Sequence, residues 1–271
     1  EALNSGNYTL VTTVGLVNIS DVNFVAAHGP YTTLFGNFTT TNNTVVYTLT
    51  GATSGGTNIQ NNGGPNTPII ANYNITGPTI TIGANNTVNA LTFSANNSLT
   101  INATGSLTVQ AGNLTVQSGS SVVSGGTLLA PAGLNKDGGG ELDFTNNMVV
   151  TGAAAVNEGL FSVNGNLTFS GGSGNITVSG NGTLGGNGSI AGNVLFAGGN
   201  LAPGNSPGNL TIGGNLVLTG ANSTIIEIAS PTDFDRITVT GQATLGGNMS
   251  VVQFGGYQLA YGQRYDILSA V

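Results

Sequence analysis

A three-residue pattern recurs along the chain: a large apolar residue, then Thr, then a β-branched or aromatic residue, separated by spacers rich in Gly and Asn. In a strand, successive side chains point to opposite faces, so each triplet directs two apolar groups to one side and one hydroxyl to the other. Neighbouring triplets begin only 8, 8 and 7 residues apart, at Leu91, Leu99, Leu107 and Leu114. This spacing leaves room for a strand and a turn, so it predicts an all-β chain with no helix longer than about two turns. The triplets begin at Ile80, Leu91, Leu99, Leu107, Leu114, Leu167, Ile176, Leu210 and Ile237.

Short strands at this spacing favour a parallel β-helix, or β-solenoid. Three strands would form one turn of roughly 20 to 25 residues, and each turn would hydrogen-bond to the next along the axis. With about 22 residues per turn and about 4.8 Å between strands, the whole chain would make about 12 turns and a rod on the order of 60 Å long. A β-sandwich or antiparallel barrel is the alternative, although it favours longer strands and two-residue hairpins.

The triplets also predict which side chains are buried, because their apolar residues should face the core and their Thr residues should face water. In the third and fourth neighbouring triplets, the inward residues are Leu107, Val109, Leu114 and Val116, and the outward residues are Thr108 and Thr115. Asn residues between the triplets are expected to form side-chain ladders at the corners of the coil.

Composition limits the partners and the chemistry of this chain. There are 3 Lys and Arg against 10 Asp and Glu, and the net charge is -7. Lys136, Arg236 and Arg264 are scattered, so we expect no basic stripe and no nucleic-acid partner. His28 is the only histidine, which excludes a His-based triad or a multi-histidine metal site. We therefore expect no cofactor and no metal.

The pattern divides the chain into three regions. Residues 1–74 are expected to form an N-terminal cap with irregular first turns, residues 75–251 the regular solenoid, and residues 252–271 a C-terminal cap or junction. A Pro- and Gly-rich stretch at 130–140 reads as an insertion. The start of the chain, at Glu1, has no basic and apolar leader, so we expect any signal peptide to have been removed or to lie outside this sequence.

All seven tyrosines lie outside residues 74–256. Tyr suits a partly exposed position, because its ring packs against other side chains while its hydroxyl reaches a hydrogen-bond partner or water. The ends of a β-solenoid carry unpaired strand edges, which are either capped or paired with another copy. The tyrosines are therefore caps, or they mark an end-to-end contact that would make a homo-oligomer. The candidates for such axial self-association are Tyr8, Tyr31, Tyr257, Tyr261 and Tyr265.

The last third of the chain resembles the passenger-associated repeats of bacterial autotransporters. The resemblance covers residues 182–271 and rests on four blocks in order: 182–190 (GTLGGNGSI), 201–212 (LAPGNSPGNLTI), 235–241 (DRITVTG) and 244–247 (TLGG). It implies a right-handed β-helix displayed outside a Gram-negative cell, often by means of a C-terminal outer-membrane β-barrel. The chain ends without the alternating strands of such a barrel, so we expect that the barrel was cleaved or omitted, or that the protein is anchored differently.

Some β-helices act on polysaccharides through clustered carboxylates, and the local candidates are Asp137, Glu141 and Asp143 beside Lys136. Three glycines separate the first of these from the others, so their spacing leaves their geometry undetermined and a solvated polar loop is the favoured interpretation. The resemblance to the passenger-associated repeats places Asp235 at a turn that enters a strand, where it is expected to cap backbone amides. Residues 185–190 resemble a calcium nonapeptide, but Ser189 stands where that site needs Asp.

These observations predict a non-enzymatic extracellular β-solenoid rod that is displayed on the cell surface as an autotransporter-like passenger or stalk. The first alternative is the subunit of a filament built by head-to-tail stacking. The second is an adhesin for a glycan or host surface, or a polysaccharide-active β-helix.

Overall fold

The computed structural model describes residues 6–12, 33–41, 44–53, 72–75, 79–82, 86–171 and 174–271. All regular structure in these ranges is strand, which confirms the all-β prediction. No helix in this part of the chain is long and apolar enough to cross a membrane. The first three strands form an antiparallel sheet in the order β1-β3-β2. Their bounds are β1 (Gly6–Thr12), β2 (Thr33–Thr41) and β3 (Thr44–Thr53).

The other strands form one 21-stranded sheet that coils into a parallel β-solenoid with three faces. Five strands bend around corners and serve more than one face: β6 (Asn86–Phe93), β7 (Ser98–Val116), β8 (Ser120–Ala130), β12 (Ala154–Val163) and β14 (Asn175–Gly186). The short strands of face 1 are β4 (Asn72–Ile75), β9 (Leu134–Asp137), β16 (Asn193–Phe196), β19 (Leu216–Leu218) and β22 (Ala243–Thr244). Those of face 2 are β5 (Thr79–Ile82), β10 (Glu141–Phe144), β17 (Asn200–Pro203), β20 (Ser223–Ile228) and β23 (Asn248–Gln253). Those of face 3 are β11 (Asn147–Thr151), β13 (Asn166–Ser170), β15 (Ser189–Ile190), β18 (Asn209–Ile212), β21 (Arg236–Val239) and β24 (Leu268–Ser269).

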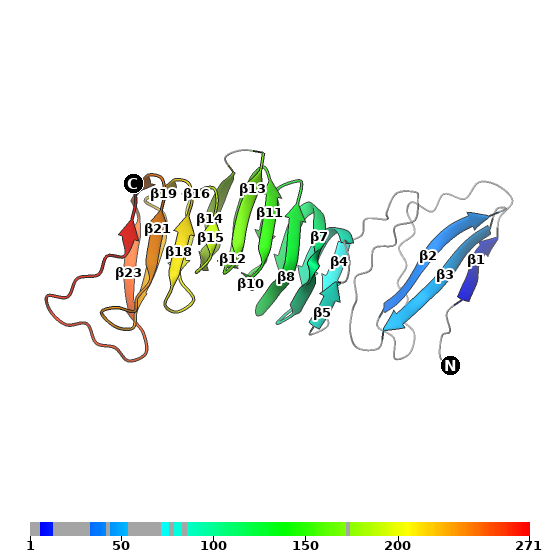
Figure 1. Cartoon of the computed structure of the whole chain (residues 1–271), viewed down its shortest axis with the longest axis horizontal. Helices are drawn as coiled ribbons and strands as arrows, with labels where there is room; N and C mark the ends of the chain where they lie inside the picture. The colour runs from blue at the N-terminus through cyan, green and yellow to red at the C-terminus, as the bar shows by residue number, and fades with distance from the viewer. Residues whose placement is uncertain are drawn as a thin grey trace.

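Each strand pairs in parallel with the strand one turn later, as the stacked arrows in Figure 1 show. Leu91 pairs with Leu114, and Leu99 pairs with Val123, so these turns contain 23 and 24 residues. The coil makes about eight turns. The expected twelve turns were wrong, because β1, β2 and β3 pair in the separate antiparallel sheet and add no turn. Parallel pairing runs from Asn72 to Ser269, while the division of the chain at residues 74 and 252 stays a prediction.

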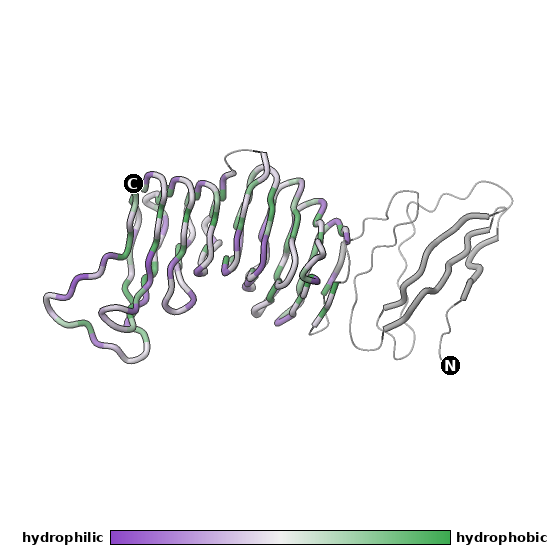
Figure 2. Tube along the Cα trace, viewed as in Figure 1, coloured by the Kyte–Doolittle hydropathy of each residue, from purple (hydrophilic) through white to green (hydrophobic). Residues whose placement is uncertain are grey.

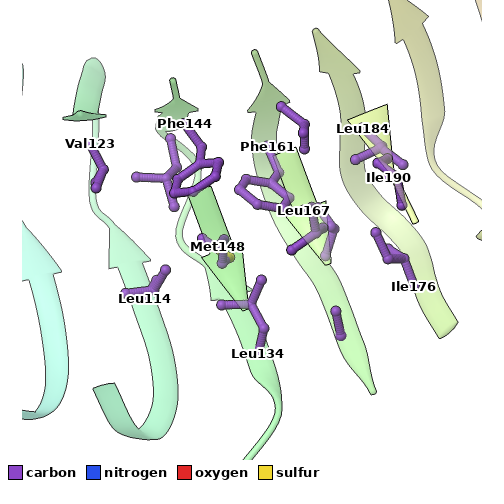
Figure 3. Packing of buried hydrophobic residues seen from close by; sticks show 14 of the residues in the cluster. Leu114, Val123, Leu134, Phe144, Met148, Phe161, Leu167, Ile176, Leu184 and Ile190 are labelled. Atoms are coloured by element: carbon purple, nitrogen blue, oxygen red, sulfur yellow. The ribbon is translucent and has the colours of Figure 1, made fainter. Parts of the chain in front are cut away.

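The core is a column of apolar side chains along the axis of the coil. Leu107, Val109, Leu114 and Val116 are all fully buried, which confirms their predicted inward position. Figure 2 shows the alternation of apolar and polar residues along successive turns, and Figure 3 shows side chains from neighbouring turns packed against one another. The predicted outward Thr108 and Thr115 are half-buried, because each is flanked on its face by strands of the neighbouring turns.

Residues 130–140 do not form an insertion. They include β9, which pairs with β7 before it and with β12 after it as a regular part of face 1. The Pro and Gly residues make the corners on both sides of this short strand. The interpretation as an insertion was wrong because the charged Lys136 stands at an inward position, in register with Leu114. It interrupts the apolar pattern of the sequence, while the backbone pairing between turns continues.

Polar side chains stack between turns on the outer surface, as predicted for Asn. Asn135 Nδ2 donates to Asn113 Oδ1 at 3.0 Å, and Asn193 Nδ2 donates to Asn175 Oδ1 at 2.9 Å. Face 3 carries an uninterrupted outward row of uncharged polar residues, which we call the polar row. It consists of Ser106, Thr127, Asn147, Asn166, Ser189, Thr211, Thr238 and Ser269.

Candidate functional site: the open C-terminal end

The last turn of the solenoid exposes residues that belong to the core by register. Met249 on β23 pairs with Thr224, and Val251 pairs with Ile226. Ile226 is fully buried, whereas Met249 is 57% exposed and Val251 is 45% exposed. Leu245, just before β23, is also exposed. These three side chains form an exposed apolar patch on the last described turn.

The backbone of the same turn has a free edge. Among the described strands, β22 pairs only with β19, β23 only with β20, and β24 only with β21. All three faces therefore end in a strand with one unpaired side. Such an edge carries N–H and C=O groups that can accept a further strand.

A long loop, residues 254–267, connects β23 to β24 and projects beyond the last turn (Figure 1). Three side chains hold its base: the hydroxyl oxygens of Tyr257 and Tyr265 lie 3.0 Å apart, and each lies 2.9 Å from Gln263 Oε1, within hydrogen-bond distance. The ring of Tyr265 packs edge-on against Phe234, with the ring centroids 5.2 Å apart. Tyr261 lies between these anchors and is fully exposed.

The environment of Tyr265 keeps its hydroxyl protonated in neutral solution. The pKa of Tyr265 is raised to about 12. Partial burial is the larger cause, and the hydrogen bond with Tyr257 is the second. The hydroxyl can therefore serve as a hydrogen-bond donor at the base of the loop.

The structure brings together two of the five predicted self-association residues. Tyr257 and Tyr265 meet at the base of the loop, and Tyr261 stands apart from them. Tyr8 lies on β1, opposite Tyr47 in the backbone register, and Tyr31 lies outside the described residues. A role of these tyrosines in self-association stays a prediction.

The candidate carboxylates are divided between two faces. Asp137 ends β9 on face 1 and accepts a hydrogen bond from Asn157 Nδ2 at 2.9 Å. Glu141 and Asp143 lie on β10 of face 2, where Asp143 Oδ1 accepts one from Asn164 Nδ2 at 2.7 Å. In the described part of the chain, no three or more His, Cys, Asp or Glu side chains gather in a way that could hold a metal ion.

Lys136 points away from these carboxylates and into the solenoid, where it is fully buried. Its Nζ donates to four carbonyl oxygens, those of Asp137 at 3.2 Å, Gly138 at 2.9 Å, Gly140 at 3.0 Å and Glu158 at 2.8 Å. Burying a charge is costly unless its hydrogen bonds are satisfied, and the carbonyls of this corner and of Glu158 in the next turn satisfy them. Lys136 is thus a structural link between two consecutive turns.

Burial sets the protonation of Lys136. It lowers the pKa of the ammonium from 10.5 to about 8, and the charges of Asp137 and Glu158 oppose part of this shift. The side chain is therefore protonated at pH 7, as four accepting carbonyls require.

The other two basic residues also have partners within the chain. Arg236 lies over the ring of Phe234, with its Cζ atom 4.0 Å from the ring centroid. Arg264 forms an exposed ion pair with Asp266 at 2.8 Å. With Lys136 buried, the described surface has no cluster of positive charge that could attract phosphate groups.

Asp235 caps backbone amides, as predicted. It is almost completely buried, and its carboxylate accepts hydrogen bonds from the N–H of Gly208 at 2.8 Å and from that of Glu227 at 2.7 Å. Burial raises the pKa of Asp235, and these two hydrogen bonds lower it in part. The side chain fastens the 204–208 loop to face 2.

Ser189, which replaces the Asp of a calcium site, lies in the polar row and donates to Asn166 Oδ1 at 2.8 Å. Its hydroxyl thus continues a side-chain ladder between turns. This contact gives the serine a structural role in the stacking of β13 and β15.

Sequence reasoning did not identify Leu245, Met249 and Val251 as surface residues. The alternation in β23 is the same as in the inner strands, so its pattern predicts burial.

No protein-family model matches this chain, and no curated protein matches it.

Proposed function

We propose that this protein is a non-enzymatic structural rod outside the cell, displayed as an autotransporter-like passenger or stalk on a Gram-negative-type bacterium. The observation that carries this proposal is the uninterrupted stacking of about eight turns along three faces. Each turn contacts its neighbours along the axis, so the geometry suits a spacer that holds its two ends apart.

The outer surface supports the same role. The polar row consists of Ser, Thr and Asn, and in its middle part the side chains bond between turns, as Asn166 does to Asn147 at 3.2 Å. Ser189 continues this ladder by donating to Asn166 at 2.8 Å. Of the three candidate carboxylates, Asp137 lies on face 1 and accepts a hydrogen bond from Asn157, whereas Glu141 and Asp143 lie two residues apart on β10 of face 2, where Asp143 accepts one from Asn164.

Surface display can be tested in intact cells of the source bacterium. Added protease should degrade the protein without lysis, while a periplasmic marker stays intact and a known outer-surface marker is lost. Recovery of the protein from the culture medium would also place it outside the cell. Protection of the protein until the cells are lysed would overturn the proposal.

Self-association through an end of the rod is a second proposed function, and the open last turn favours it. Met249 and Val251 expose apolar surface beside a free strand edge. A copy that covered this edge would bury the apolar patch and pair the free backbone groups in one step.

A further inference from the structure

We propose that Asn181 is a site of spontaneous chemical modification, at which the side-chain amide is lost and the asparagine becomes aspartate or isoaspartate. The reaction needs only water and groups of this chain, so the inference goes beyond the proposed role as a rod and does not depend on it. It follows from the hydrogen bonds that hold the Asn-Gly pairs of the solenoid, which differ from one pair to the next.

The chemistry is an attack of the backbone on the preceding side chain. The backbone nitrogen of the residue after an asparagine bonds to the Cγ atom of that asparagine, and the Cγ–Nδ2 bond breaks. The proton of the backbone nitrogen passes through water to the departing amide nitrogen, which leaves as ammonia. Water then opens the five-membered imide at either of its carbonyl carbons, which gives aspartate or isoaspartate. Glycine favours the attack, because it has no Cβ atom to hinder the approach.

Four asparagines of this chain precede a glycine: Asn62, Asn164, Asn181 and Asn187. Asn62 lies outside the described residues. Asn164 and Asn187 lie at the corner between faces 2 and 3, in consecutive turns, and Asn181 lies where β14 bends from face 1 to face 2. All three have the same reactive dipeptide, so the structure alone distinguishes them.

Asn164 is held at both groups that would have to move. Its Nδ2 donates to Asp143 Oδ1 at 2.7 Å, and its Oδ1 accepts a hydrogen bond from the N–H of Asn187 at 3.0 Å. The attacking nitrogen, that of Gly165, donates to the Phe144 carbonyl at 2.9 Å. The imide ring can close only after these bonds open, so the fold protects Asn164.

Asn187 is held through its backbone. Its side chain is exposed and has no hydrogen-bond partner among the described residues. The attacking nitrogen, that of Gly188, however donates to the Val163 carbonyl of the preceding turn at 2.8 Å. Closing the ring at this position breaks a bond of the ladder between turns, so the fold protects Asn187 as well.

Asn181 lacks the restraints that hold Asn164. It is exposed, and within the described part of the chain its side chain has no hydrogen-bond partner. The ladder between β12 and β14 shifts register immediately before it. The space beside it is open too, because no atom lies within 4 Å of the point where a Cβ atom on Gly180 would stand. The amide of Asn181 can therefore turn toward the nitrogen of Gly182 without first breaking a side-chain contact.

The product places a second carboxylate beside Glu158. Asn181 pairs with Glu158 in the ladder, so the backbones that carry the two negative charges are about 4.8 Å apart, and the charges repel each other. Isoaspartate also adds a methylene group to the backbone at the bend. Both changes weaken the corner at which the Glu158 carbonyl accepts a hydrogen bond from Lys136.

The test is a time course of the purified, folded 271-residue chain in mildly alkaline buffer, followed by peptide mass spectrometry that separates asparagine, aspartate and isoaspartate. Asn181 should convert at least about 10-fold faster than Asn164 or Asn187, because each hydrogen bond that must open first lowers the reactive population. The same time course in urea is the control, and there all three asparagines should convert at similar rates.

Two variants test the assignment through the ammonia that the folded protein releases. Asn181→Ser should remove the early release. Asn187→Ser is the matched control, because Asn187 is also exposed and also has a side chain without a partner, and it should leave the early release unchanged. Equal rates at the three sites in the folded chain would overturn the proposal, as would an Asn181 that stays intact while the unfolded chain reacts.

Discussion

Lys136 shows how one residue can be charged and still belong to the core. Its Nζ bonds to three carbonyl oxygens of the corner that follows β9 and to the Glu158 carbonyl of the next turn, so the backbone supplies the solvation that water would give. The sequence favours a solvated polar loop at this position, because Lys is almost never fully buried without partners. Those partners are backbone carbonyl groups, which every residue has. The residue types in the sequence therefore could not predict them.

This burial makes a prediction about pH. The folded-state pKa of Lys136 is about 8, below its ordinary value of 10.5, so the unfolded chain binds more protons between these two values. The free energy of unfolding therefore contains a contribution that rises with pH across this window. Below about pH 8 both states are protonated, and the contribution of Lys136 is constant.

Lys136→Met removes this contribution and keeps every other titrating group. In urea unfolding from pH 7 to pH 10.5, the stability of the unmodified protein relative to Lys136→Met should be level up to about pH 8 and then rise. A difference that stays flat or falls across the window would show that Lys136 is not buried as a charged group.

Leu107 and its neighbour Thr108 test the register of the strands at single-residue resolution. Leu107→Ala removes fully buried atoms and should lower the free energy of unfolding by about 2 to 5 kcal/mol. Thr108→Ala should cost less than about 1 kcal/mol, since a half-exposed side chain contributes mainly through cross-strand contacts. Denaturant unfolding of the two variants measures both costs, and equal costs would contradict the assigned register.

At the scale of elements, the strands were predictable and the corners were not. The burial of a triplet such as Leu107-Thr108-Val109 can be predicted from the triplet alone, because the alternation within one strand decides which side is buried. A corner depends on contacts between turns, as at Asp235, whose partners Gly208 and Glu227 lie 27 and 8 residues away. The type of interaction at Asp235 followed from the turn position that the resemblance implied, but its two partners required the fold.

Asp235 therefore anchors the 204–208 loop, and removing it should loosen this element. Asp235→Ala leaves two backbone N–H groups without their acceptor and should cost about 1 to 3 kcal/mol of stability. Asp233→Ala is the matched control, because Asp233 is exposed and its substitution should change stability by no more than about 0.5 kcal/mol. Thermal or urea unfolding compares the two, and similar costs would remove the capping role from Asp235.

At the scale of the whole molecule, the solenoid was predictable and its length and ends were not. The repeat spacing indicated coiling because short strands cannot bury their apolar side without neighbours. The number of turns failed because β1, β2 and β3 pair with each other, and the sequence pattern of Thr and apolar residues does not distinguish parallel from antiparallel neighbours. The exposure of the last turn was not predicted either, because β23 has the same alternation of apolar and polar residues as an inner strand.

The stacking of turns along one axis is the central claim, and spin-label distances along the polar row test it most directly. The chain contains no cysteine, so labels attach only to introduced ones. Pairs of labels would join Ser106 to Asn166, Ser189, Thr211 or Thr238, which lie three, four, five and six turns further along face 3.

With about 4.8 Å per turn, the four backbone separations should be about 14, 19, 24 and 29 Å. The measured distances should therefore rise in equal steps, although the sequence intervals between the labelled positions are unequal. Distances that level off or fall out of order, as they would in a sandwich that folds back on itself, would contradict the solenoid.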